Sequence, residues 1–69
     1  MKTAEVRIIK CIDESIMYWI KFKSDCQSMW LEYHDSNLEN VRWFARMFVK
    51  ALRNCGAKVI LRKKIYDNY

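Results

Sequence analysis

The change in hydrophobic period after residue 34 is the feature that most constrains how this chain can fold. Before it, apolar and polar residues alternate, which is typical of strands that bury one face. After it, apolar residues recur every three to four positions, which is typical of an amphipathic helix. The chain has no proline and a single glycine to interrupt these patterns. Together with a last alternating segment, they predict the element order β-β-β-α-β.

Four segments are predicted to be strands, because they alternate and are rich in β-branched or aromatic residues. Polar turn formers separate the first three of them. The predicted strands cover residues 5–12, 16–22, 28–33 and 57–63. The remaining segment, KIYDNY, is predicted to be a tail outside the sheet.

The helix has a predicted start and a predicted end. Ser36 stands three residues before Glu39, which is the spacing of a capping box. Gly56 is expected to end the helix, because a left-handed residue is favoured at that point. The apolar stripe between these two signals consists of Leu38, Val41, Phe44, Ala45, Phe48, Val49 and Leu52.

These elements predict a two-layer α+β fold with one helix on one face of a mixed sheet. The first three strands form an antiparallel meander. A right-handed crossover through the helix places the fourth strand parallel to the first, in the order 3-2-1-4. With 69 residues the chain is predicted to be one small domain, residues 1–69, with an ordered core at about 4–65. A domain of this size buries only about 60% of its unfolded surface, so a partner would help to stabilise it.

Alternation along the strands assigns side chains to the two faces of the sheet. The second turn pairs Phe22 with Met29 and Tyr18 with Tyr33. These side chains share the face that the helix stripe needs. The core is therefore assigned without the tryptophans at positions 19 and 30.

The opposite side of the sheet, which we call the open face, is predicted to stay uncovered, because one helix covers only one face. A large apolar patch rimmed by charge marks an interaction surface. Aromatic rings among cations suit nucleic acid, a protein partner, or a second copy packed face to face as a homodimer. The binding-surface residues predicted on the open face are Arg7, Trp19, Lys21, Trp30 and Arg62.

A second candidate surface lies on the polar side of the helix. Its last turns carry cations and no anion, which the helix macrodipole explains only in part. The ordinary interpretation of such a stripe is a solvated helix face. The residues predicted to bind on this surface are Arg42, Trp43, Arg46, Lys50 and Arg53.

Charge and cysteine usage indicate the class of protein. The net charge is +5, from 13 Lys and Arg against 8 Asp and Glu, which permits binding to polyanions. The N-terminal residues lack the apolar core of a secretory signal, and no apolar run is long enough for a membrane span. Three cysteines without short spacings indicate reduced thiols and a cytoplasmic location.

No catalytic or metal-binding constellation is predicted. Cys11, Cys26, Cys55 and His34 would supply four zinc ligands, but the topology separates them. Cys11 and His34 lie near one end of the sheet, and the other two lie near the opposite end. Cys11 and His34 could form a nucleophile–base pair, but no third group presents itself. A single glycine excludes a glycine-rich phosphate loop. We therefore expect a non-enzymatic protein with no metal and no cofactor.

Two resemblances bear on the function. The order of three antiparallel strands and a helix, over residues 5–55, resembles the DNA-binding domains of the plant AP2 type and of some phage integrase arms. That resemblance implies a sheet face in the major groove, with Arg7, Trp19, Lys21 and Trp30 at the DNA. The chain lacks the turn glycines of those domains and has an extra strand. Its size and aromatic patch also look like phage-encoded inhibitors, including anti-CRISPR proteins, which implies a protein partner.

The sequence therefore predicts a small binding module. Nucleic acid is the first expected partner, through the open face first and the helix stripe second. The alternative is a protein–protein inhibitor of phage or mobile-element type, or a homodimer through the open face. Salt separates the two, because counterion release makes nucleic-acid binding strongly salt-dependent.

Overall fold

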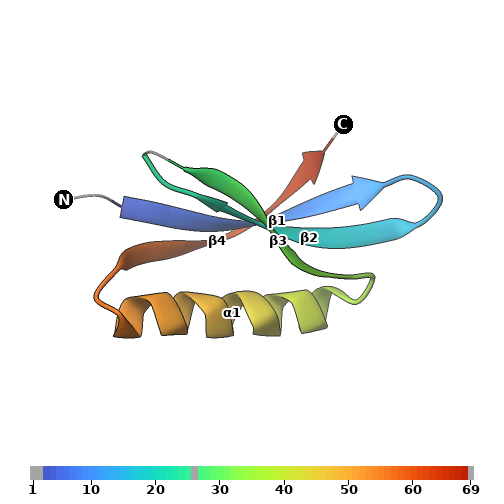
Figure 1. Cartoon of the computed structure of the whole chain (residues 1–69). Helices are drawn as coiled ribbons and strands as arrows, with labels where there is room; N and C mark the ends of the chain where they lie inside the picture. Colours follow the sequence, from blue (N-terminus) through green and yellow to red (C-terminus); the bar gives the residue numbers. More distant parts are fainter. Residues whose placement is uncertain (1–2, 26, 69) are drawn as a thin grey trace.

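The computed structural model describes residues 3–25 and 27–68 (Figure 1). Its elements are β1 (Thr3–Ile12), β2 (Ile16–Lys23), β3 (Ser28–Asp35), α1 (Leu38–Asn54) and β4 (Lys58–Asn68). The strands form one sheet in the order β3-β2-β1-β4, in which β4 runs parallel to β1 and the other neighbours are antiparallel. The predicted α+β fold and strand order are confirmed.

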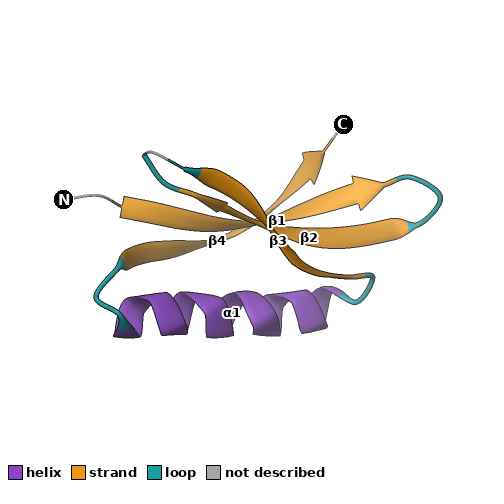
Figure 2. Ribbon diagram, viewed as in Figure 1, coloured by secondary structure: helices purple, strands orange, loops and turns teal. Residues whose placement is uncertain are grey.

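The helix lies along one face of the twisted sheet, and no helix of the described residues covers the other face (Figure 2). The chain passes from β3 into the first turn of α1, and from the last turn of α1 into β4. The start of β4 therefore lies beside the start of β1 (Figure 1). Thr3 pairs with Lys58 at that end. The open face is therefore the side of the sheet away from α1, as predicted.

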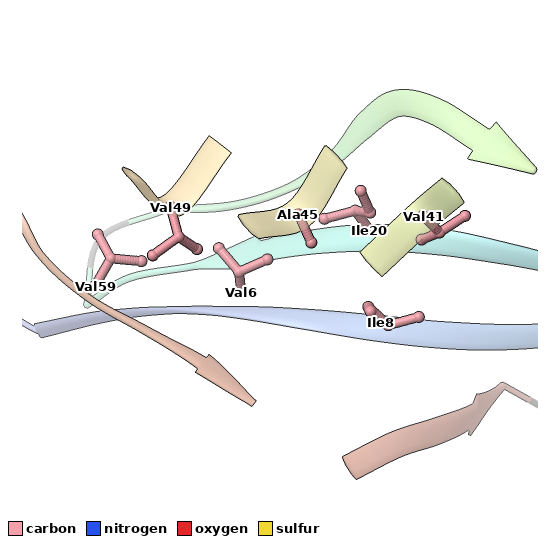
Figure 3. Packing of buried hydrophobic residues seen from close by; sticks show 7 residues of the cluster. All are labelled: Val6, Ile8, Ile20, Val41, Ala45, Val49 and Val59. Atoms are coloured by element: carbon pink, nitrogen blue, oxygen red, sulfur yellow. The ribbon is translucent and has the colours of Figure 1, made fainter. Parts of the chain in front are cut away.

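The core lies between α1 and the helix-facing side of the sheet (Figure 3). Val41, Ala45 and Val49 are the buried residues of the helix, at the spacing of one helical face. They pack against strand residues that are almost completely buried: Val6, Ile8, Ile20 and Val59. The predicted apolar stripe of the helix is confirmed.

The helix begins one residue later than the predicted capping box requires. Its N-cap is Asn37, whose Oδ1 accepts hydrogen bonds from the backbone N–H groups of Glu39 (2.9 Å) and Asn40 (3.4 Å). The capping role predicted for Ser36 is wrong, because Asp35 Oδ1 accepts the N–H of Asn37 at 2.9 Å and fixes that residue at the cap. The predicted helix end is confirmed, since Gly56 has a φ of +90°.

The segment predicted to be a tail is part of β4, so that prediction is wrong. Val6 pairs with Leu61, but Ile8 pairs with Ile65, so three residues of β4 stand against Arg7 alone. These three residues are Arg62, Lys63 and Lys64. The two extra residues form a bulge that preserves the alternation, and the strand then continues to Asn68. In the sequence, these three cations interrupt the apolar alternation of β4 before it resumes at Ile65.

A similar irregularity interrupts the pairing of β2 with β3. Phe22 pairs with Met29 as predicted, but Tyr18 pairs with Asp35 instead of Tyr33. The ladder shifts by two residues, so every side chain keeps its predicted face. Tyr33 stacks on Phe44 of the helix, with ring centroids 4.4 Å apart. The predicted pairing is wrong here, while the predicted faces are right.

Candidate nucleic-acid interface

The open face carries a second, small apolar layer built from aromatic rings. Trp19 stacks on His34 with centroids 4.0 Å apart, and Trp30 meets the Trp19 ring edge-on at 6.4 Å. Ile9 lies between Trp19 and Tyr66 in the sheet register. It is only 7% exposed, although it does not belong to the core cluster under the helix. The rings therefore shelter Ile9 and complete the packing of this face.

Cations already lie over the aromatic rings of the open face. Lys21 Nζ lies 4.9 Å from the centroid of Trp30. Arg7 and Lys64 lie over the ring of Tyr66, at 4.7 and 5.2 Å. Such cation–π contacts stabilise the rings where they are. A base that stacked here would have to displace a protein group.

Glu5 neutralises much of the charge that the sequence predicted for this face. Its carboxylate forms an ion pair with Arg7 and accepts a 2.6 Å hydrogen bond from Arg62 Nε. The hydrogen bond from Arg62, together with the nearby Arg7, holds the pKa of Glu5 below its ordinary value. The Glu5 side chain is only 16% exposed and has both guanidinium groups as partners. Two of the predicted binding cations are thus engaged within the protein.

A different concave surface lies between α1 and β4. Two hollows of about 440 and 490 Å³ adjoin there and share Arg46 and Leu61 as lining residues. We call them together the α1–β4 trough. Its apolar floor includes Ile8, Val49 and Leu61. Among the described residues that line it, none is acidic. The cations of the trough are Arg42, Arg46, Lys50, Arg53, Arg62 and Lys63.

Three of the trough cations have partners within the protein. Arg42 pairs with Glu39 at 3.3 Å on the exposed helix surface. Arg53 donates two hydrogen bonds, of 3.1 and 2.8 Å, to the carbonyl oxygen of Val59, which ties the helix end to β4. The third is Arg62, which is held by Glu5 as described above.

The other three trough cations have no hydrogen bond or ion pair with any residue in the described parts of the chain. They are Arg46, Lys50 and Lys63. All three are exposed. Two come from the helix and one from the β4 bulge, so charge without a partner faces the trough from both of its walls.

Helical spacing explains why the cations of α1 line one side of the trough. Arg42, Arg46 and Lys50 follow one another at intervals of four residues, and such residues lie on one side of a helix. Trp43 lies on the adjoining, solvent-facing side and is 58% exposed, whereas Met47, which is 41% exposed, also lines the second hollow. Trp43 makes no ring or cation–π contact with the other described residues. Among the described aromatic residues, Trp43 is the most exposed.

The predicted site residues lie on two surfaces, and Arg62 belongs to both, because it pairs with Glu5 of the open face and also lines the trough. On the open face, Trp30 contacts Trp19 and Lys21, and Arg7 pairs with Glu5, whereas the helix residues lie along α1. Lys63 was missed by sequence reasoning, although it belongs to the cationic run RKK. Its place in the trough depends on the β4 bulge, which the sequence did not reveal. Glu5 was also missed, and its only signal is its position two residues before Arg7 on the same face of β1.

The end of the sheet near the first hairpin carries a shallower hollow of about 380 Å³. Cys11 and His34 both line it, together with Asp13 and Glu14 of the turn. The predicted proximity of Cys11 and His34 is confirmed, whereas Cys26 lies outside the described residues. Within residues 3–25 and 27–68, no three His, Cys, Asp or Glu side chains could hold a metal ion together. The helix of the described chain is too short and too polar to cross a membrane.

No family model, no curated protein and no solved structure matches this chain. The resemblance to DNA-binding domains of the AP2 type stays one of element order. It extends over α1 and the three antiparallel strands, whereas β4 has no counterpart in that order.

Proposed function

We propose that this protein is a non-enzymatic nucleic-acid-binding module that holds phosphate groups in the α1–β4 trough. The observation that carries the proposal is that Arg46, Lys50 and Lys63 line the two adjoining hollows of the trough, with no acidic neighbour among the described lining residues. Phosphate neutralisation by Lys and Arg supplies most of the sequence-independent affinity of proteins for nucleic acid. A cytoplasmic location, indicated by the odd cysteine count, belongs to the same proposal.

The trough is a better phosphate site than the open face for two reasons. On the open face, Glu5 offsets the charge of Arg7 and Arg62, and a phosphate would compete with that carboxylate. In the trough, three cations have no such competitor. A concave site with low-dielectric walls also focuses the electrostatic potential of its charges. The order of the two surfaces is therefore the reverse of the order expected from the sequence.

A basic stripe on a helix is often only a solvated surface. Here the cations of α1 face a second cationic wall on β4, and like charges that converge repel one another. The repulsion costs free energy that a bound polyanion relieves. The stretch of β4 that supplies Lys63 is a bulge, a feature that is common beside functional sites because it redirects side chains.

A protein-binding role for the open face is the second candidate function. Trp30 and Ile60 are each 44% exposed there, and Trp is enriched in the hot spots of protein interfaces. The partner would be a target of a phage-type inhibitor, such as an anti-CRISPR protein, or a second copy in a homodimer. Binding of this kind would depend only weakly on salt.

The proposal is tested with two double variants that remove the same charge. Lys50→Ala with Lys63→Ala removes one cation from each wall of the trough. Lys10→Ala with Lys23→Ala removes two lysines of β1 and β2 that do not line it. The binding of a fluorescent mixed-sequence oligonucleotide pool is measured by anisotropy at low and moderate salt.

We expect the trough variant to lose affinity. The slope of log K against log salt concentration should fall in magnitude by between about 1 and 2, because two phosphate contacts are lost. The control variant should retain most of the affinity and slope. Equal losses in both variants would show that net charge, and not the trough, is responsible, and would refute the proposal.

A further inference from the structure

We infer that the ligand of the α1–β4 trough is single-stranded nucleic acid. The nucleic-acid strand lies lengthwise along α1 and stacks a base on Trp43. This inference rests on the proposed function and names the form of nucleic acid that the trough takes. Three features of the described residues support it: the concave shape with an apolar floor, the spacing of the cations, and the open ring at the rim.

The shape of the trough suits one strand better than a duplex. Its cations stand on two walls, and Leu61, which is half-buried and lines both hollows, is the apolar side chain that its floor offers to a ligand, since Ile8 and Val49 are only 2% and 3% exposed. A duplex presents phosphates on a convex rod and keeps its base faces stacked inside. It could touch the rims, but it would leave the apolar floor uncovered. A single strand offers both phosphates and apolar base surface, as grooves for single strands require.

The spacing of the helix cations matches a strand that runs along the helix axis. Arg42, Arg46 and Lys50 rise by about 6 Å from one to the next, at 1.5 Å per residue. This rise is comparable with the separation of adjacent phosphates in an extended strand. From Arg42 to Arg53 the trough follows about 17 Å of helix. The site therefore spans about three phosphates, and Lys63 faces them from the other wall.

Trp43 lies on the solvent-facing side of α1 beside the trough and lines neither of its two hollows. It precedes Arg46 by three residues, so the two side chains are neighbours on the helix surface. Its side chain is 58% exposed, and no cation or ring among the described residues covers it. Trp19, Trp30 and Tyr66 on the open face are all in contact with other groups. Base stacking on an aromatic ring tolerates any sequence, because every base has an aromatic face.

The experiment compares three probes of one mixed sequence: a DNA single strand, its duplex with the complementary strand, and an abasic strand of the same length. Affinity and tryptophan fluorescence are measured for the full chain and for four variants. Trp43→Ala removes the ring, Trp43→Phe keeps an aromatic face but removes the fluorophore, and Trp19→Phe is the matched control. The variant with Lys50→Ala and Lys63→Ala reports on the phosphate contacts.

We expect the single strand to bind at least about tenfold more tightly than the duplex, and Trp43→Ala to lose about tenfold in affinity for it. The abasic strand should bind about as weakly to the unchanged protein as the complete strand binds to Trp43→Ala. Fluorescence quenching by the complete strand should persist in Trp19→Phe and disappear in Trp43→Phe.

The outcomes separate this inference from the proposed function. Duplex binding as tight as single-strand binding, still weakened by the lysine variant, would overturn the strand preference and leave the proposed function standing. Quenching that persists in Trp43→Phe would overturn the role of Trp43. If none of the three probes bound, the proposed function and the inference would both be wrong.

Discussion

Replacing Ile9 by alanine tests whether the open face is a packed layer or an available docking surface. Ile9 is 7% exposed, lies on the side of the sheet away from the helix, and has Trp19 and Tyr66 as its neighbours in the register. The change removes three carbon atoms from this sheltered place. At about 0.8 kcal/mol for each buried carbon, the transfer cost is about 2.4 kcal/mol. Incomplete collapse of the rings around the gap adds to it, so we expect a total of about 2.5–3 kcal/mol.

The matched control is Ile60→Ala, because Ile60 lies on the same face of the sheet but is 44% exposed. It should cost less than about 1 kcal/mol, since most of its apolar surface is already in contact with water. Urea unfolding followed by tryptophan fluorescence measures both changes. In a domain of this size, the Ile9 variant should also lose about 10–20 °C in Tm.

The reasoning would be refuted if Ile9→Ala and Ile60→Ala cost the same small amount. The rings of the open face would then not be packed on Ile9 in solution. These rings would then be available to a partner, and the open face would be the first candidate for the binding surface. A large cost for Ile9 alone would show that Trp19 and Tyr66 serve the stability of the sheet.

Three further changes test the local structure. Asn37→Ala should cost about 1 kcal/mol in the free energy of unfolding, whereas Ser36→Ala should cost little, because Asn37 is the helix cap. Ile65→Ala should cost about 1–2 kcal/mol in the free energy of unfolding, measured with urea, because Ile65 packs on the core. If this segment were an unpacked tail, the change would leave the stability unaltered. Glu5→Gln should flatten the loss of stability in acid. The pKa of Glu5 is lowered in the folded state, so its contribution is complete above the ordinary value of 4.5 and disappears as the pH falls through the lower folded value. Urea unfolding from pH 7 to pH 3 checks this. If the free energy of unfolding fell as steeply in acid for the Glu5 variant as for the unchanged protein, the prediction would be contradicted.

The element order could be predicted from the sequence because the hydrophobic period changes once and cleanly. The assignment of faces also held where the pairing of β2 with β3 departs from the predicted register. Both irregular places, after Val6 in β1 and after Trp19 in β2, shift the pairing by two residues, and a shift of two leaves each side chain on its original face. A shift of one would have reversed the faces and brought the tryptophans under the helix.

The second half of β4 could not be predicted, since three successive cations interrupt its alternation just where the bulge occurs. The pattern resumes with Ile65 and Tyr66, but two residues are too few to indicate a strand on their own. Their environment in the sheet, beside Ile8 and Ile9, determines their structure.

The candidate site was predictable only in part for a related reason. Helical spacing placed Arg42, Arg46 and Lys50 together without knowledge of the fold. The opposite wall of the trough depends on the bulge in β4, and the neutralisation of Arg7 depends on Glu5. Contacts between strands that are distant in the sequence decide which cations are available, and local patterns do not record them.

The most direct test of the phosphate-binding account is the salt dependence of single-strand binding by the unchanged protein. If Arg46, Lys50 and Lys63 hold about three phosphates, the slope of log K against log salt concentration should be about −2. It should be shallower when Lys50 and Lys63 are replaced and unchanged when Lys10 and Lys23 are replaced. A slope near zero, or the same slope in both double variants, would contradict the account.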